Sequence, residues 1–265
     1  MRKILLIAMA FAVLLTGTAF AQSYKDGIYF AEEAAFARDG WKFQAIVEVA
    51  GGKIVSAKYN AVNVIGLPDK KAAAKEGKYV MKAKQGEWDV QSARAEAALV
   101  KVGDPSKIAV KSNGTTDAIS GCSIIVKNFL DLVPKALAAG PVEKGPYSKD
   151  GWYFARAKTY DATGYAATAL ITVVNGRVVS AVSNAENKKG GPTKYVSSIS
   201  GKYVMKAKQG EWYVQADRMG KALVKVQDPT KIAVKSNGTT DAISGVSVFV
   251  NEFFKIAAEA LKKAK

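Results

Sequence analysis

Two short segments of the sequence place a carboxylate, two hydroxyls and a glycine at the same spacing. The first segment, DAISGCS, contains Asp117, Ser120, Gly121 and Ser123. The second segment, DAISGVS, contains Asp241, Ser244, Gly245 and Ser247. Glycine lets an anion approach the backbone because no Cβ stands in the way, and a hydroxyl group can hydrogen-bond to that anion. The spacing therefore indicates a site for an anionic group such as a phosphate.

Each segment precedes a run that is expected to be a helix, and this position suits a phosphate. The start of a helix presents unpaired backbone N–H groups and the positive end of the helix dipole. The hydroxyls of Ser123 and Ser247 are expected beside those N–H groups. A simpler interpretation is that Asp117 or Ser120 only caps the helix while Gly121 serves the turn. The second copy does not decide between the two, because a duplication copies a cap as faithfully as a binding site.

The two segments belong to a long internal repeat. GKYVMKAKQGEW occurs at 77–88 and again at 201–212, and KIAVKSNGTTDAISG occurs at 107–121 and again at 231–245. The offset is 124 positions in both cases, which indicates a duplicated domain and excludes a short-period solenoid. Between the copies, residues 139–149 carry two prolines and two glycines, as a linker does. The sequence therefore predicts two domains, at 22–140 and 141–265.

Each copy is expected to be an α+β domain. Residues 168–174 and 177–183 are rich in β-branched side chains, and the Asn-Gly pair between them is typical of a hairpin turn. Residues 87–102 lack internal Gly and Pro and predict a helix. Residues 107–110 predict a short strand. A last helix is expected to place four apolar side chains on one face: Phe249, Phe253, Ala257 and Ala260.

The first residues predict a secretory signal peptide at 1–21. Arg2 and Lys3 form a basic start, residues 4–15 are apolar, and residues 19–21 supply small side chains for cleavage. The apolar run is shorter than the roughly 20 residues that span a bilayer. The chain is therefore expected to be exported to the periplasm or outer surface of a bacterium, with no transmembrane anchor after cleavage.

Composition excludes several kinds of chemistry. The sequence has no histidine, so Ser-His-Asp and Cys-His nucleophiles and His metal sites are excluded. Cys122 is the single cysteine, so an intramolecular disulfide or redox pair is excluded. We expect Cys122 to be a small buried residue and not a reactive thiol. The net charge of +16 would suggest nucleic acid in a cytosolic protein. Export makes acidic partners, anionic surfaces or a phosphate-bearing ligand better candidates, and a solvated lysine-rich face remains an alternative.

The two motif segments resemble the Asp-x-x-Ser/Thr-Gly-Ala-Thr signature of FMN-binding domains. Such domains occur in subunits of sodium-pumping NADH:quinone reductase and Rnf complexes and in exported flavoproteins of extracellular electron transfer. The resemblance covers the predicted mature chain as two domains, and DGIYFAEE with the following hairpin region also matches. It departs from the signature at Cys122 and Val246, where alanine is usual, and in having serine where threonine is usual.

The resemblance implies a cofactor and its attachment. In the family, a flavin transferase uses FAD to attach FMN through a phosphoester to the last hydroxyl residue of the signature. Ser123 and Ser247 would then be the acceptors. Asp117 and Asp241 would mark the first position of the signature. The turn beside the phosphate would consist of Ser120, Gly121, Ser244 and Gly245.

Two classes of function follow from the sequence. The first is an exported flavoprotein that relays electrons between redox partners of the cell envelope and is not an enzyme with its own substrate. The second is a flavin-free binding or structural module, or a surface antigen, on the same fold. Six side chains could pack on a flavin ring, although such residues more often belong to a core: Tyr79, Met81, Trp88, Tyr203, Met205 and Trp212.

Overall fold

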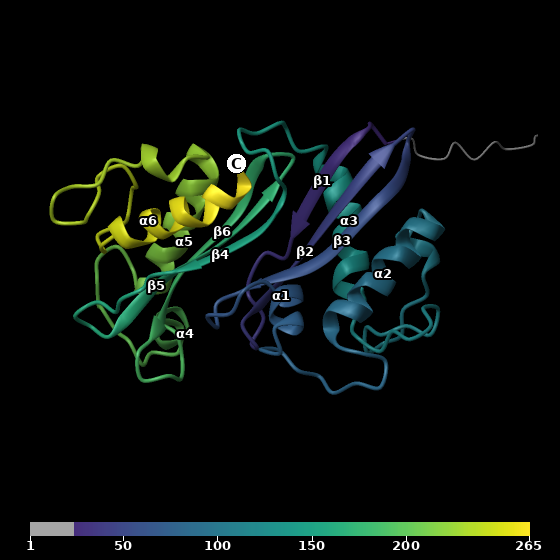
Figure 1. The fold of residues 1–265 in the computed structure, drawn as a ribbon, viewed down its shortest axis with the longest axis horizontal. Coiled ribbons are helices and arrows are strands. Elements are labelled where there is room, and N and C mark those ends of the chain that lie inside the picture. The colour runs from purple at the N-terminus through teal and green to yellow at the C-terminus, as the bar shows by residue number, and fades with distance from the viewer. Residues whose placement is uncertain (1–23) are drawn as a thin grey trace, which may run out of the picture.

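The computed structural model describes residues 24–265. The expected signal peptide at 1–21 lies outside the described residues. The described chain consists of two similar α+β units, each with a three-stranded antiparallel sheet and helices packed on it (Figure 1). The predicted fold class is therefore confirmed, and the two units are referred to below as repeat 1 and repeat 2.

Repeat 1 is an antiparallel meander followed by helices. Its sheet has the order β1-β2-β3, and the strands are β1 (Gly27–Glu32), β2 (Trp41–Ala50) and β3 (Lys53–Asn63). Its helices are α1 (Lys70–Lys75), α2 (Trp88–Val102), the 3₁₀ turn η1 (Pro105–Lys107) and α3 (Lys127–Ala139).

Repeat 2 follows the same course 124 positions later. Its strands are β4 (Gly151–Arg156), β5 (Tyr165–Val174) and β6 (Arg177–Asn187). Its helical elements are α4 (Lys194–Ile199), α5 (Trp212–Val226), η2 (Pro229–Lys231), α6 (Asn251–Leu261) and η3 (Lys262–Ala264). Strand register is kept as well, because Gly27 opposes Val49 and Gly151 opposes Val173. Positions 124 apart can therefore be compared directly.

The hairpin and the first long helix form where the sequence predicts them. Asn175 and Gly176 have φ of 50° and 71°, the left-handed values that a two-residue hairpin turn requires. Helix α2 ends at Gly103, whose φ of 74° is left-handed and whose N–H donates to the Leu99 carbonyl. Glycine tolerates that conformation at the end of a helix because it has no Cβ.

Two expectations about local structure are wrong. Residues 107–110 do not form a strand in the described chain, because Pro105 starts a 3₁₀ turn that Asp104 caps through the Ser106 N–H. Phe249 is not on the buried face of the last helix. Helix α6 begins at Asn251, and Phe249 lies before it with 72% of its surface exposed. The other three members of the predicted face are buried: Phe253, Ala257 and Ala260.

The two sheets meet in the middle of the molecule, and the long helices lie outside them (Figure 1). In repeat 1, α3 packs on β1 and β2 while α2 packs on β3; in repeat 2, α6 packs on β4 and β5 while α5 packs on β6. Val62 and Val64 of repeat 1 join the hydrophobic core of repeat 2. The Val64 carbonyl also accepts hydrogen bonds from Asn184 Nδ2 at 2.7 Å and Thr193 Oγ1 at 2.6 Å. The two repeats thus share an interface beyond the linker.

The predicted linker at 139–149 is bound to both repeats. The Val142 N–H donates to the Ile28 carbonyl of β1, and the Tyr147 N–H donates to the Gly176 carbonyl in the β5–β6 turn. The Ser148 N–H donates to the Ala264 carbonyl at the end of repeat 2. The division of the chain into two domains at 22–140 and 141–265 stays a prediction.

Candidate functional site

The two motif aspartates form surface ion pairs and do not cap helices. Lys111 Nζ lies 2.5 Å from Asp117, and Lys235 Nζ lies 2.6 Å from Asp241. Both aspartate side chains are 82% exposed. Helices α3 and α6 start at Lys127 and Asn251 without a side-chain cap. The capping interpretation of Asp117 and Ser120 is therefore wrong, because the motif lies too far before the helix.

Two N–H groups of the expected anion site at each helix start are bonded to the chain itself, and the anion site stays a prediction. In repeat 1, the N–H groups of Val126 and Lys127 both donate to the carbonyl of Gly114, at 2.9 and 3.1 Å. In repeat 2, the carbonyl of Gly238 takes the same position and accepts from Val250 and Asn251, at 2.8 and 3.4 Å. The loop folds back over the helix start, so these N–H groups are occupied. The assignment of Ser123 and Ser247 as acceptors stays a prediction.

A buried glutamine holds each motif serine. The N–H of Ser123 donates to Gln91 Oε1 at 2.7 Å, and its hydroxyl lies 3.1 Å from the same oxygen. The N–H of Ser247 donates to Gln215 Oε1 at 2.7 Å, and its hydroxyl lies 3.3 Å away. Both glutamines are fully buried. Their Nε2 groups donate to the carbonyls of Gly86 and Gly210, which fixes the direction of each amide.

An arginine lies against each motif glycine. Arg94 Nη1 donates to the Gly121 carbonyl at 2.5 Å, and Arg218 Nη1 donates to the Gly245 carbonyl at 2.6 Å. A Cβ added to either glycine would lie 3.0 Å from that Nη1, and both glycines have left-handed φ, at 68° and 71°. Only glycine fits this turn without strain. The same Nη1 atoms also donate to the carbonyls of Gln85 and Gln209, so each guanidinium holds the motif turn against the loop before the helix.

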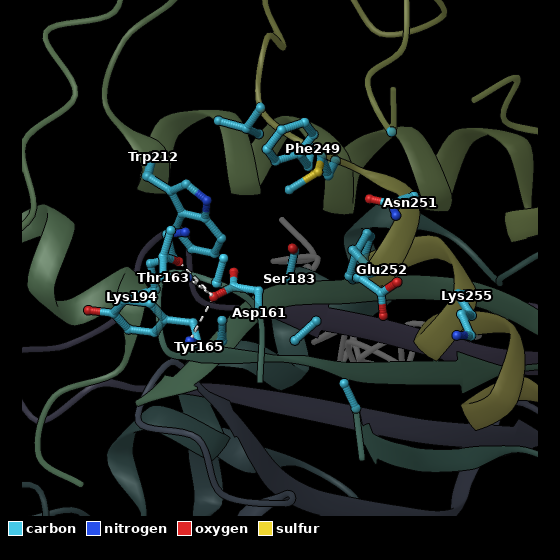
Figure 2. A pocket seen from close by; sticks show the side chains of 18 of the residues that line it. Asp161, Thr163, Tyr165, Ser183, Lys194, Trp212, Phe249, Asn251, Glu252 and Lys255 are labelled. Carbon is cyan, nitrogen blue, oxygen red and sulfur yellow. Dashed lines mark hydrogen bonds between the residues drawn. The ribbon is translucent and has the colours of Figure 1, made fainter. Parts of the chain in front are cut away.

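A large cavity opens beside the motif in repeat 2 (Figure 2). Its volume is about 930 Å³, in the range of about 300–1,000 Å³ that is typical of small-molecule sites. Three of the predicted ring-packing residues line it, namely Tyr203, Met205 and Trp212, and so does Ser247. Asp241, Ser244 and Gly245 lie outside its lining. The structure therefore places Ser247 and a group of aromatic side chains on the wall of one cavity.

The cavity wall includes a buried lysine in an aromatic cage. Lys194 Nζ lies 5.1 Å from the ring centre of Tyr165, 4.8 Å from Tyr203 and 5.5 Å from Trp212. Such cation–π contacts stabilise the ammonium group. Burial acts in the opposite direction and lowers the pKa of Lys194, although the Asp161 carboxylate opposes that effect. The cavity therefore holds a positive charge with little access to water.

Asp161 supplies a negative charge that interacts with the positive charge of Lys194. Burial disfavours its ionised form, but hydrogen bonds from the Tyr165 N–H and from Thr163, together with the Lys194 charge, lower its pKa. Figure 2 shows Asp161 near the middle of the cavity wall, with Glu252 and Lys255 of α6 on the opposite side. Acidic and basic groups thus both face the cavity.

Sequence reasoning missed the glutamines, the arginines and Lys194. The signal for four of them was recurrence at the offset of 124, which holds for two pairs: Gln91 with Gln215, and Arg94 with Arg218.

For Cys122, the expectation of a buried residue is confirmed, since it is 7% exposed and burial raises its pKa. Within residues 24–265 no group of acidic or cysteine side chains could hold a metal ion, and no helix has the length and apolarity to cross a bilayer.

No protein-family model matches the sequence, and a search of curated proteins finds no relative. Among solved structures, the chain is similar to an NMR structure of a protein from Clostridium thermocellum, with 43% identity and a TM-score of 0.37 over 47% of this chain and 99% of that chain. It is also similar to a crystal structure of a protein from Clostridium perfringens, with 25% identity and a TM-score of 0.36 over 44% of this chain and 88% of that chain. Each match spans less than half of the present chain.

Proposed function

We propose that the protein is an exported electron carrier that holds FMN on a motif serine. The observation that supports this most directly is that Ser247, the last hydroxyl of the motif, lies on the wall of the 930 Å³ cavity together with Trp212 and Tyr203. A flavin joined at Ser247 could therefore place its ring among aromatic side chains of the same repeat. Redox partners in the envelope and a flavin transferase with FAD as donor complete the proposal.

The chemical types that line the cavity fit a flavin. Aromatic rings and the thioethers of Met205 and Met219 suit a flat, polarisable ring system. Lys194 suits the carbonyl oxygens at the edge of such a ring, because its ammonium group can donate hydrogen bonds to them. Arg218 beside the Gly245 turn suits the phosphate.

Attachment to Ser247 would be a group transfer that balances without a redox step. The serine Oγ forms an ester bond to the phosphorus of the FMN half of FAD. The bond from that phosphorus to the bridging oxygen breaks, and AMP leaves with the electron pair. The serine proton passes to a base of the transferase or to water. Gln215 accepts the hydroxyl hydrogen bond and so positions Oγ, while the charge of Arg218 favours the anionic phosphate.

Bound FMN would supply reversible uptake of one or two electrons. The chain's own part would be to shield the ring from water and to set the charge around it. Lys194 would favour electron uptake, because a buried positive charge stabilises the negative charge gained on reduction. Loss of Arg2 and Lys3 with the expected signal peptide lowers the net charge from +16 to +14, and this charge would speed encounters with acidic redox partners.

The test is expression of the chain together with a flavin transferase, followed by intact-protein mass measurement. We expect an added mass equal to FMN less one water, and Ser247→Ala should remove it. Ser123→Ala is the matched control for the loss of a motif hydroxyl. A parallel titration of the unmodified chain with free FMN detects binding without attachment. If neither experiment shows flavin on the protein, the electron-carrier proposal is wrong and the flavin-free binding module is left.

A further inference from the structure

We propose that repeat 2 alone holds the flavin and that two aromatic side chains close repeat 1 to it. This inference rests on the proposed function and names which of the two motif serines serves it. It comes from comparing side chains at positions 124 apart, which the common strand and helix bounds of the two repeats make equivalent.

The cavity of repeat 2 exists where the sequence has two small residues. Ala167 on β5 and Ser183 on β6 both line it. The equivalent residues of repeat 1 are Phe43 on β2 and Tyr59 on β3. Two large rings therefore stand in repeat 1 where repeat 2 has a methyl group and a hydroxymethyl group.

Tyr59 is a fixed part of the repeat 1 core. It is fully buried, and its ring stacks on Phe129 with centroids 4.9 Å apart and planes at 20°. It also lies 5.4 Å from the ring of Phe43 and 5.1 Å from that of Trp88. Its hydroxyl donates to the Ile125 carbonyl at 3.1 Å. Because packing and a hydrogen bond both hold the ring, it cannot swing aside as a lid would.

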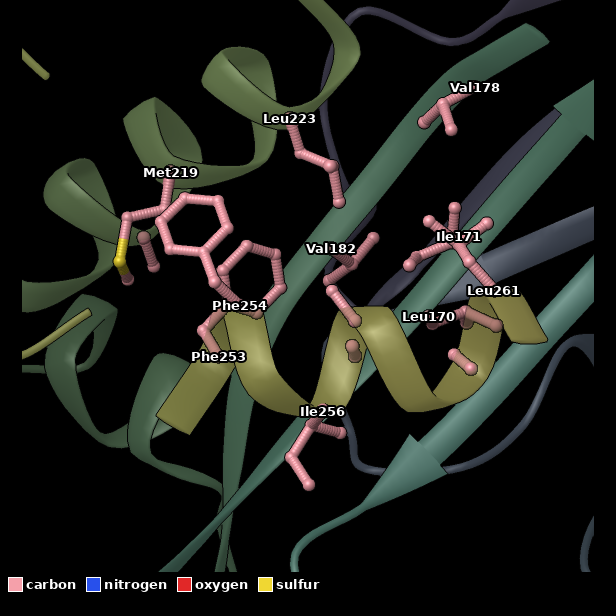
Figure 3. Close-up of a cluster of buried hydrophobic side chains, with 14 of the residues drawn as sticks. Leu170, Ile171, Val178, Val182, Met219, Leu223, Phe253, Phe254, Ile256 and Leu261 are labelled. Atoms are coloured by element: carbon pink, nitrogen blue, oxygen red, sulfur yellow. The ribbon is translucent and has the colours of Figure 1, made fainter. Parts of the chain in front are cut away.

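Phe129, on which Tyr59 stacks, has an equivalent in repeat 2 with different neighbours. Phe253 occupies the position equivalent to Phe129, and it lines the cavity together with Met219. Figure 3 shows Phe253 beside Met219 and Phe254 at the end of the hydrophobic core. In repeat 2 a serine, Ser183, stands where Tyr59 covers Phe129, so no aromatic ring from that position covers Phe253, which is itself 4% exposed.

The two buried lysines show the same difference. Lys70 Nζ of repeat 1 is surrounded by four rings, at 4.7 Å from Trp41, 4.9 Å from Phe43, 4.5 Å from Tyr79 and 5.4 Å from Trp88. Lys194 has three rings, and Ala167 replaces the fourth. The missing ring leaves that side of Lys194 facing the cavity. Only the lysine of repeat 2 can therefore meet a ligand.

The residue at the rim of the cavity also favours flavin binding to repeat 2 over repeat 1. Phe249 lines the cavity and is 72% exposed, whereas the equivalent Ile125 of repeat 1 is an aliphatic residue. An exposed aromatic ring at the rim of a cavity gains contact area when a flat ligand binds against it. The phenylalanine that was wrongly expected on the buried helix face is thus placed to cover a ligand.

Exchanging the two residue pairs tests the inference. The closed variant, Ala167→Phe with Ser183→Tyr, gives repeat 2 the side chains of repeat 1. The opened variant, Phe43→Ala with Tyr59→Ser, makes the reverse change. Each variant and the wild type are co-expressed with a flavin transferase, and peptide mapping locates the flavin. Circular dichroism shows whether each variant is folded, and titration with free FMN measures binding to unmodified protein.

We expect one flavin per wild-type chain, on the peptide that contains Ser247. The closed variant should lose that label and bind FMN at least about tenfold more weakly, a loss of about 1.4 kcal/mol. The opened variant should gain label at Ser123; if it does not fold, the closed variant decides. Equal labelling of Ser123 and Ser247 in the wild type, or full labelling of a folded closed variant, would overturn the inference. Absence of flavin from every form would instead overturn the proposed function.

Discussion

The indole N–H of Trp152 donates a hydrogen bond of 2.6 Å to Oε1 of Gln44, and this bond joins β4 of repeat 2 to β2 of repeat 1. The same oxygen accepts from the Thr172 hydroxyl at 3.0 Å. Gln44 Nε2 donates to Glu32 at 2.8 Å, and Gln44 itself is fully buried. One glutamine thus satisfies polar groups of both repeats inside the interface between the sheets.

Replacing Gln44 by leucine should weaken the interface. The side chain keeps a similar size, but the Trp152 N–H and the Thr172 hydroxyl lose their acceptor. An unsatisfied buried polar group costs about 1–3 kcal/mol, so we expect the free energy of unfolding to fall by at least that amount. Urea denaturation followed by tryptophan fluorescence measures it. Gln85→Leu, at an exposed position of repeat 1, is the control, and a Gln44→Leu protein as stable as this control would contradict the prediction.

Lys70 should make stability rise with pH above neutrality. Burial lowers the pKa of Lys70 from 10.5 to about 8 in the folded protein. Below pH 8 the lysine is charged in both the folded and unfolded states, and the cost of burying that charge is fully present. Between pH 8 and 10.5 the folded state releases the proton while the unfolded state retains it, so the free energy of unfolding increases. At about 1.4 kcal/mol per pH unit, the gain approaches about 3 kcal/mol as the pH nears 10.5.

The measurement compares unfolding of wild type and Lys70→Met at intervals between pH 7 and 10. Tyrosines titrate in both proteins, so the difference between their curves isolates Lys70. Lys75→Met, at the exposed end of the same helix, should give a curve parallel to that of wild type. If the difference between wild type and Lys70→Met stays constant over this range, the lysine does not lose its proton there.

Local structure could be predicted where one or two residues decide it. The turn at Asn175 and Gly176 and the helix end at Gly103 depend on left-handed backbone conformations that those residues favour. The expected strand at 107–110 failed because a proline and an aspartate cap impose a tighter turn than β-branched composition suggests. Phe249 was misplaced because periodicity does not show where the loop ends and helix α6 begins.

The site could be predicted only in part, because the role of each residue depends on its place in the fold. The duplicated serines are visible in the sequence, and the repeat suggests two equal sites. The exchange of Phe43 for Ala167 and of Tyr59 for Ser183 is visible too, but its meaning depends on both positions facing one space between sheet and helices. That fact comes from pairing of β2 with β3 and from the packing of α3. Sequence spacing alone therefore cannot distinguish the open repeat from the filled one.

The final prediction concerns how Gln215 holds the proposed acceptor. Its Oε1 accepts the N–H groups of Ser247 and Val248, at 2.7 and 3.2 Å, and the Ser247 hydroxyl at 3.3 Å. Gln215→Leu leaves Ser247 in the sequence but removes all three bonds, so the hydroxyl is no longer directed. We expect flavin attachment to fall by about tenfold or more, because each lost bond is worth roughly 0.5–1.5 kcal/mol.

A loss of stability alone could also reduce attachment, and the repeat supplies the control. Gln91→Leu removes the matching bonds to Ser123 in repeat 1 and should cost a similar free energy of unfolding. If repeat 2 alone holds flavin, Gln91→Leu should keep wild-type labelling at Ser247 while Gln215→Leu loses it. Attachment is measured by intact mass and stability by urea denaturation on the same samples. Equal labelling of the two variants would show that Gln215 stabilises the fold without positioning the serine.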